Sequence, residues 1–294
     1  IFLSISSSRT DIRVFLSILN KGSPRAILRN KRPYSQGCLA QCWENFLYWA
    51  KQIRVIAMPS DSQTNPSVLF VGAGPGNPDL LTLGAARALA QARVVLHDRL
   101  VGEGVLKLAN PRAIMVDVGK EGFGATMKQG EINALLIAFG LEGPGVVRLK
   151  GGDCGIFGRL DEEIDALDGA GVTWGILPGI TSATAAAASI GQSLTRRGRN
   201  GSLRILTGHD VEGFAEHDWR TLAGDGQVAA IYMGKKAARF VQGRLLMHGA
   251  LPSTPVTIVE NASRPDERVL QATLATLPAV AETATGPAVI LYGL

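Results

Sequence analysis

A glycine-rich stretch, FVGAGPGNPDLLT over residues 70–82, is the first part of the sequence whose residue types could hold a ligand. It follows the apolar run SVLFV, and Gly72, Gly74 and Gly76 let backbone approach a bound molecule closely. A dinucleotide-binding loop would read G-x-G-x-x-G and open directly into a helix. Here Asn77 takes the place of the third glycine, and the nearby prolines remove N–H donors that a phosphate would need. The stretch therefore indicates a ligand loop that is poorly suited to phosphate.

Two further polar motifs follow strand-like segments. HDRLV (97–101) follows the apolar run RVVL, and KGGD (150–153) follows GVVRL. The carboxyl ends of parallel strands meet at one rim of a sheet, and ligands gather there. We therefore expect the glycine-rich stretch, Asp98 and KGGD to lie on one rim.

The elements that must position these motifs follow an alternating pattern between residues 67 and 179. Apolar runs alternate with amphipathic helices, which is typical of parallel strands with right-handed crossovers. Strands are predicted at 67–74, 93–98, 113–119, 145–153 and 172–179. Helices are predicted at 80–92, 130–143 and 161–171, and the second of these ends in glycine, a common helix stop.

The pattern changes after residue 179. TSATAAAASI (181–190) predicts a helix of small side chains that a neighbour or a ligand can approach closely. Strands are predicted at 202–209, 227–234, 254–262, 267–274 and 287–294, and ERVLQATL alternates like a half-exposed antiparallel strand. We therefore predict two α/β domains, 67–179 with a parallel sheet and 180–294 with a mixed sheet, with a cleft between them.

Composition limits the classes of function. The chain has 294 residues, 46% of them hydrophobic, which is enough for two domains with cores. Residues 1–57 carry nine of the 30 Lys and Arg and two of the 25 Asp and Glu, a net charge of +7, so the remaining residues carry −2 of the total of +5. Residues 58–294, the body of the chain, therefore give no electrostatic reason to expect nucleic-acid binding. No apolar run approaches the roughly 18 residues of a membrane span.

Residues 1–66 are predicted to be a leader that is unstructured or wrongly started. The first methionine is Met58, and our preferred interpretation is that translation begins there and leaves the upstream residues without a folding role. A basic, acid-poor organelle transit segment and an additional interaction segment are the alternatives. Cys38 and Cys42 lie in this leader, so Cys154 is the one thiol of the body. A single thiol forms no internal disulfide, which favours a reducing cytoplasm.

Six motifs, in this order, resemble those of the uroporphyrinogen-III C-methyltransferases of the tetrapyrrole methyltransferase superfamily. They are GAGPG (72–76), HDRLV (97–101), RLKGGDCGIFGR (148–159), LPGITSA (177–183), YMG (232–234) and VENASRPD (259–266). The resemblance covers residues 67–294. It implies the tetrapyrrole methylase fold, an active site in the cleft between the domains, and S-adenosylmethionine (SAM) as the methyl donor.

The resemblance also implies a SAM site. Its residues would be Pro75, Gly151, Gly152, Asp153, Ile156, Thr181, Ser182, Met233 and Ala262. The two glycines would let backbone pass close to SAM, and Asp153 would offer a carboxylate to ribose hydroxyls or to the ammonium group of the methionine tail. The sequence departs from the family at Cys154 and Gly155, where Pro and Phe are commoner, and this change is expected to loosen the SAM loop.

Asp98 and Lys120 match the family positions regarded as proton acceptor and proton donor. Methyl transfer from a sulfonium needs no protein nucleophile, but it needs an aligned pyrrole carbon and a group that takes the proton. A helix cap or an ion pair with Arg99 is the alternative role for Asp98. The alternative role for Lys120 is to bind a substrate carboxylate.

The implied substrate is a polycarboxylate ring, so cationic side chains are expected to face it. Arginine forks suit carboxylates. The candidates are Arg99, Arg148, Lys150, Arg196, Arg197 and Arg199, and of these we predict Arg99, Arg148 and Arg197 to bind the substrate. The four histidines lack the spacing of metal ligands, so we predict no metal.

The predicted activity is SAM-dependent methylation of uroporphyrinogen III at C2 and C7, which gives precorrin-2 for siroheme or cobalamin synthesis. A methyltransferase for a later corrin intermediate is the alternative within this class. A nicotinamide-dependent oxidoreductase, with Asp98 holding the ribose, is the alternative outside it. We also expect a cytoplasmic homodimer that binds its tetrapyrrole substrate but neither nucleic acid nor membrane.

Overall fold

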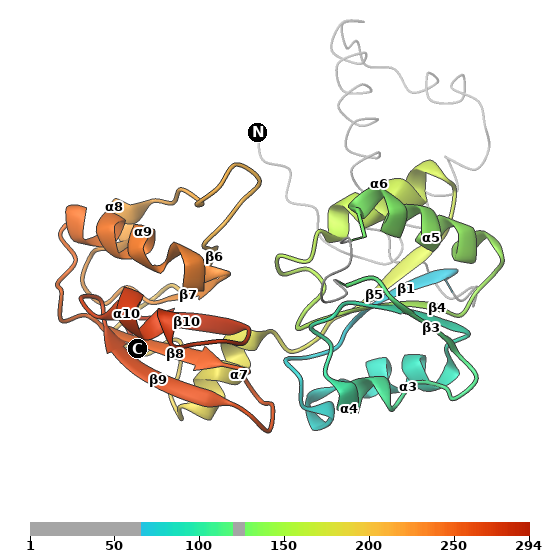
Figure 1. Ribbon diagram of the computed structural model, residues 1–294, viewed down its shortest axis with the longest axis horizontal. Coiled ribbons are helices and arrows are strands. Elements are labelled where there is room, and N and C mark those ends of the chain that lie inside the picture. Colours follow the sequence, from blue (N-terminus) through green and yellow to red (C-terminus); the bar gives the residue numbers. More distant parts are fainter. Residues whose placement is uncertain (1–65, 120–126) are drawn as a thin grey trace, which may run out of the picture. The chain divides into compact units, whose positions relative to one another are not determined.

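The computed structural model describes residues 66–119 and 127–294 (Figure 1). These residues belong to one compact unit, Thr64–Leu294. Residues 1–65 of the predicted leader and the predicted proton donor Lys120 lie outside the described residues. Within the described ranges, no helix has both the length and the apolar character that a membrane crossing requires.

The first half of the unit forms a sheet of five parallel strands in the order β3-β2-β4-β1-β5. The strands are β1 (Val68–Gly72), β2 (Val94–His97), β3 (Ile114–Asp117), β4 (Val146–Lys150) and β5 (Trp174–Leu177). Each lies within a segment predicted as a strand. β1 and β4 are central and covered on both faces, which is why both are mainly apolar.

Helices cover both faces of this sheet (Figure 1). The helices α3 (Leu83–Gln91) and α4 (Glu103–Leu106) pack on one face, and α5 (Gln129–Leu141) and α6 (Leu160–Gly169) pack on the other. A short 3₁₀ helix, η2 (Pro78–Leu80), precedes α3. The sequence predicts α3, α5 and α6, whereas the single turn of α4 is too short to show a helical period.

The second half begins with α7 (Ser182–Ser189) and forms a five-stranded sheet in the order β6-β7-β10-β8-β9. The strands are β6 (Arg204–Thr207), β7 (Ala229–Tyr232), β8 (Pro255–Glu260), β9 (Arg268–Thr273) and β10 (Ala288–Tyr292). The β6–β7 pair is parallel, and the other three pairs are antiparallel. The predicted α/β fold with one parallel and one mixed sheet is confirmed.

Three helices of this second half are not predicted by the sequence analysis. The longest, α9 (Gly234–Met247), links β7 to β8, and α8 (Trp219–Leu222) and α10 (Leu277–Glu282) precede β7 and β10. Ala237, Val241 and Leu245 of α9 are buried at intervals of four residues. This spacing is typical of a helix with one buried face, so the signal for α9 is present in the sequence.

Glu260 is a buried carboxylate at the end of β8. Its Oε1 accepts hydrogen bonds from the backbone N–H groups of Thr285 (2.6 Å) and Gly286 and from the Thr285 hydroxyl (3.2 Å). Its Oε2 pairs with Arg268 at 3.0 Å. Burial by itself raises the pKa of Glu260, but the hydrogen bonds and the charge of Arg268 outweigh burial and lower the pKa below its ordinary value.

We expect Glu260 to make the stability of the fold sensitive to acid. A carboxyl group with a lowered pKa in the folded state stabilises the fold fully above its unfolded-state pKa, 4.5 for glutamate. That contribution is lost as the pH falls through the folded-state pKa. The difference in melting temperature between the wild type and Glu260→Gln should therefore be largest near about pH 6 and shrink towards about pH 3. A constant difference across this range would contradict the prediction.

Candidate active site

A cavity of about 600 Å³ opens at the carboxyl ends of the parallel strands and is shared with residues of the second sheet. The loops that follow β1, β2 and β4 line it, together with the start of α7 and the ends of β7 and β8. All nine residues predicted to bind SAM line this cavity: Pro75, Gly151, Gly152, Asp153, Ile156, Thr181, Ser182, Met233 and Ala262. Asp98 lines it as well.

The glycine-rich stretch and KGGD are joined backbone to backbone. The N–H of Gly74 donates to the carbonyl of Gly152 (3.0 Å), and the N–H of Gly152 donates to the carbonyl of Gly74 (2.8 Å). Both glycines have φ of +69°, a conformation that other residues rarely adopt. A Cβ on Gly72 would lie 2.5 Å from the backbone nitrogen of Gly179. The backbone conformation therefore favours glycine at 74 and 152, and the packing of the loops requires it at 72, before any ligand is considered.

Asp153 organises the loop that follows β4. Its Oδ1 accepts a hydrogen bond from Gly155 N (2.8 Å), and its Oδ2 accepts one from Gly179 N (2.9 Å). Cys154 beside it is fully buried, with Sγ 3.7 Å from the carbonyl oxygen of Leu177. Burial, followed by the negative charge of Asp153, raises the pKa of this thiol. Cys154 is therefore a packing residue, and the backbone N–H of Gly155 ties the loop to Asp153. The effect of these two residues on the SAM loop stays a prediction.

Tyr232, at the end of β7, lines the cavity and belongs to the YMG motif, but it is not among the residues predicted to bind SAM. Its hydroxyl shares a short hydrogen bond with the hydroxyl of Thr181 and accepts one from Ala183 N (2.8 Å) at the start of α7. Its ring lies 5.4 Å from that of Phe157, centroid to centroid. Burial raises the pKa of Tyr232, so the phenol stays neutral. The sequence signal for Tyr232 as a site residue is an aromatic ring with a polar hydroxyl at the end of a predicted strand.

Three other cavity residues have a left-handed backbone although they are not glycine. Phe157, Met233 and Asn261 have φ of 51°, 52° and 51°. Such conformations cost about 1–3 kcal/mol each, and they persist where the surrounding structure fixes them. They occur preferentially at ligand and active sites, so their presence on this wall supports its assignment as the functional site.

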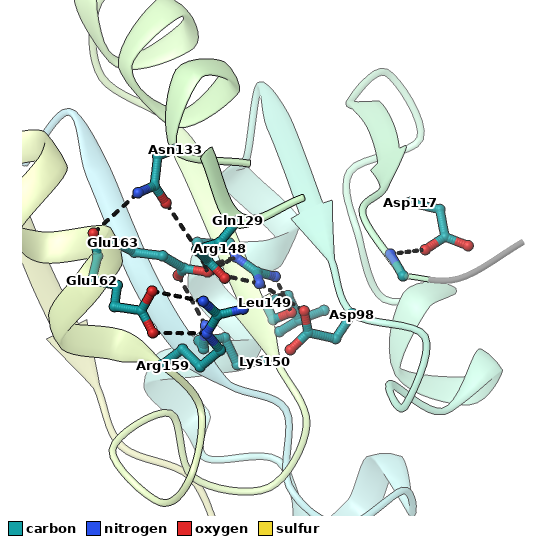
Figure 2. Close-up of polar contacts among 11 residues, drawn as sticks. Asp98, Asp117, Gln129, Asn133, Arg148, Leu149, Lys150, Arg159, Glu162 and Glu163 are labelled. Atoms are coloured by element: carbon teal, nitrogen blue, oxygen red, sulfur yellow. Dashed lines mark hydrogen bonds and ion pairs between the residues drawn. The ribbon is translucent and has the colours of Figure 1, made fainter. Parts of the chain in front are cut away.

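A network of four charged side chains leads from the cavity into the first sheet (Figure 2). Arg148 and Lys150 lie on the same side of β4, because strand residues alternate, and Glu163 meets them from the first turn of α6. Arg148 Nη2 donates to Asp98 Oδ1 (2.7 Å) and to Glu163 Oε1 (3.0 Å), and Lys150 Nζ donates to Glu163 Oε2 (2.9 Å). Gln129 of α5 adds a hydrogen bond to Glu163 Oε1 (3.2 Å).

Burial of this network is deepest at Glu163 and decreases towards Asp98. The side chains of Glu163, Arg148 and Asp98 are 0%, 2% and 33% exposed. Burial lowers the pKa of Arg148, but the charges of Asp98 and Glu163 outweigh burial and raise it, so Arg148 stays cationic. Burial and the charge of Arg148 lower the pKa of Lys150. The network holds two charges of each sign, and its members Asp98 and Lys150 reach the cavity.

The three arginines predicted to bind the substrate do not line the cavity. Arg99 is exposed next to Asp98, and Arg197 is exposed in the segment between α7 and β6. Their roles stay predictions. Arg148 is buried beneath the cavity and its donors are directed to Asp98, Glu163 and the carbonyl of Leu149. These contacts favour a role in holding Asp98 over direct contact with a substrate.

The fold and the cavity together define a tetrapyrrole methylase. Residues 67–278 match the tetrapyrrole (corrin/porphyrin) methylases, and the chain belongs to this family. Uroporphyrin-III C-methyl transferase from Thermus thermophilus, solved in complex with S-adenyl homocysteine, is 40% identical with a TM-score of 0.67, over 77% of this chain and 96% of that one. A cobalt precorrin-4 methyltransferase is 28% identical with a TM-score of 0.69, over 77% and 94%.

Curated relatives of the chain are siroheme synthases. Siroheme synthase 3 of Aeromonas hydrophila is 41% identical over 244 residues, which are 83% of this chain and 52% of the relative. Siroheme synthase of Edwardsiella ictaluri is 40% identical over 264 residues, 90% and 57% of the two chains. The chain therefore spans about half the length of the curated relatives that it matches. The resemblance to uroporphyrinogen-III C-methyltransferases is confirmed at the level of the family.

Proposed function

We propose that the protein is a SAM-dependent uroporphyrinogen-III C-methyltransferase, which methylates C2 and C7 and gives precorrin-2 for siroheme or cobalamin synthesis. The observation that carries the proposal is the convergence of the nine predicted SAM residues on one cavity that Asp98 also lines. The similarity to a uroporphyrin-III C-methyl transferase solved with S-adenyl homocysteine supports both the substrate class and the methyl donor.

The cavity fits SAM in size and in chemistry. Its volume lies in the range of about 300–1,000 Å³ that is usual for small-molecule sites. The nearest atoms to a Cβ on Gly152 would be those of Ser182, 3.9 Å away, so the missing side chain leaves room beside the backbone. Asp153 and the hydroxyl of Thr181 supply polar groups, and Met233 supplies an apolar surface. SAM would supply an activated methyl group on a sulfonium sulfur.

We assign the substrate proton to Asp98. When a pyrrole carbon takes up a methyl group, the ring gains positive charge and then has to release a proton. A carboxylate on the cavity wall can offset that charge and accept the proton. Arg148 Nη2 donates a hydrogen bond to Asp98 Oδ1 (2.7 Å), and this bond fixes the orientation of the carboxylate. Lys120 is retained as the proposed proton donor.

The remaining expectations are part of the same proposal. We propose two α/β domains, 67–179 and 180–294, and a cytoplasmic homodimer that binds neither nucleic acid nor membrane. The charge of −2 on residues 58–294 is consistent with the absence of nucleic acid. We also propose that catalysis uses no metal; within residues 66–119 and 127–294, His, Cys, Asp and Glu form no group of three or more that could hold one.

Mass spectrometry of the tetrapyrrole after incubation with uroporphyrinogen III and SAM tests the activity. We expect a mass gain of two methyl groups. If the mass does not increase while a control enzyme is active under the same conditions, the proposal is wrong. Consumption of a later corrin intermediate would favour the alternative methyltransferase. Calorimetry with S-adenosylhomocysteine and with NAD⁺ distinguishes the proposal from a nicotinamide-dependent oxidoreductase.

A further inference from the structure

The segment Thr283–Pro287, which we call the strap, runs from the end of α10 into β10 and reaches the cavity. Pro287 and the first residues of β10, Ala288 and Val289, line the cavity. The backbone N–H of Asn261, which also lines it, donates to the carbonyl of Pro287 at 2.8 Å. The position of the strap therefore sets the shape of this wall.

Two side chains of opposite charge hold the strap from different elements. Glu260 of β8 accepts hydrogen bonds from the N–H groups of Thr285 and Gly286. Lys235 of α9 donates from Nζ to the carbonyl oxygens of Ala284 (2.9 Å) and Gly286 (2.6 Å). Gly286 is therefore fixed at both its N–H and its C=O, one by an anion and the other by a cation. Hydrogen bonds to charged groups are stronger than those between neutral groups.

The strap has no room for a side chain at Gly286. A Cβ at this position would lie 2.5 Å from Oδ1 of Asn261. Asn261 in turn is anchored by a hydrogen bond from Nδ2 to Asp266 Oδ2 (2.7 Å). Lys235 itself lines the cavity, so the residue that holds the strap is also part of the cavity wall.

We propose that Lys235 and Glu260 are positioning residues for the methyl donor, because they hold the strap so that Pro287 and Ala288 present a preformed wall to SAM. The inference rests on the proposed function. It adds two residues that affect the affinity for SAM and are not among the nine predicted SAM residues. A preformed wall raises affinity because binding does not have to order it. Neither side chain forms a hydrogen bond or an ion pair with Asp98. They should therefore affect binding rather than the chemical step.

Lys235→Met tests the inference, because it keeps an aliphatic side chain and removes both hydrogen bonds to the strap. We expect the calorimetric Kd for S-adenosylhomocysteine to rise about tenfold, the effect of losing one or two charge-assisted hydrogen bonds. Amide hydrogen exchange of residues 283–288 should become faster, while turnover at saturating SAM should stay within about twofold of the wild type. Lys235→Arg keeps a cationic donor and should recover part of the affinity.

Arg239→Met is the matched control. Arg239 lies one turn after Lys235 on α9, its side chain is exposed, and it does not line the cavity. Removing its positive charge should therefore leave the Kd for S-adenosylhomocysteine unchanged. If Lys235→Met folds poorly, Glu260→Gln tests the other side of the strap, because it removes the charge that strengthens the hydrogen bonds from Thr285 and Gly286. An unchanged Kd in the strap variant, with normal binding by the wild type, overturns the inference and leaves the proposed function intact. A wild-type protein that binds no S-adenosylhomocysteine overturns the proposed function instead.

Discussion

Asp98→Asn is expected to lower the methylation rate by about 10²- to 10⁴-fold, the usual contribution of a general acid–base group, while the affinity for SAM stays near that of the wild type. An amide keeps the size of the side chain, and its oxygen can still accept the hydrogen bond from Arg148 Nη2, now 2.7 Å long. It can neither take a proton nor offset positive charge. Single-turnover rates at saturating SAM and calorimetric affinities measure the two effects separately.

Two other variants serve as controls for this experiment, one for the rate and one for SAM binding. Asp117→Asn makes the same chemical change at the end of the neighbouring strand β3, where Asp117 accepts a hydrogen bond from Gly119 N (2.8 Å) and lies apart from the charged network (Figure 2). Its rate should stay near that of the wild type. Gly152→Val should lose SAM binding itself, because φ is +69° there and the side chain would enter the space beside the loop. Loss of SAM binding by Asp98→Asn with a normal rate at saturation would place Asp98 in the donor site instead.

Glu163→Gln is expected to lower the free energy of unfolding by about 3–5 kcal/mol, the range measured when one partner of a buried ion pair is removed. Glu163 is 0% exposed and pairs with both Arg148 and Lys150. The amide leaves these two buried cations with a single carboxylate, that of Asp98. It also removes a negative charge from the first turn of α6, where the helix dipole favours one. Chemical denaturation of the two proteins measures the loss.

Glu162→Gln is the control at the adjacent position. Glu162 pairs with Arg159 at 2.7 Å, but the two side chains are 52% and 57% exposed. Exposed pairs contribute about 0–1 kcal/mol, so the loss should be correspondingly small. Equal losses in the two variants would show that the buried network does not depend on the charge of Glu163.

The two sheets could be predicted because their strands are short apolar runs with glycine, proline or polar residues at their ends. The cavity could be predicted for a different reason. Parallel strands bring GAGPG, Asp98 and KGGD to one rim even though the three are far apart in the chain, and the order of the motifs indicated a family. Nine of the residues that line the cavity followed from that resemblance, although their contacts with a ligand stay predictions.

Pairings between distant side chains could not be predicted from the sequence. In the sequence, Arg148 is one arginine among several, and a polycarboxylate substrate was the obvious partner for it. The packing of α6 on one face of β4 is what brings Glu163 to it. The same holds for the strap, because Lys235 and Glu260 meet at Gly286 only through the fold of α9, β8 and β10. The spacing of residues along the sequence does not indicate such contacts.

The strand order of the first sheet also determines when that sheet can form during synthesis. β1 is made first, but Val68 pairs with Val146, 78 positions later in the chain. At about 5–20 residues per second, a ribosome needs about 4–16 s to deliver this partner. β2 and β3 can pair sooner, yet β4 has to enter between β2 and β1 before the sheet is continuous. During those seconds the apolar strand β1 has no strand partner on the nascent chain, and such an unpaired apolar strand is a segment that chaperones protect from aggregation.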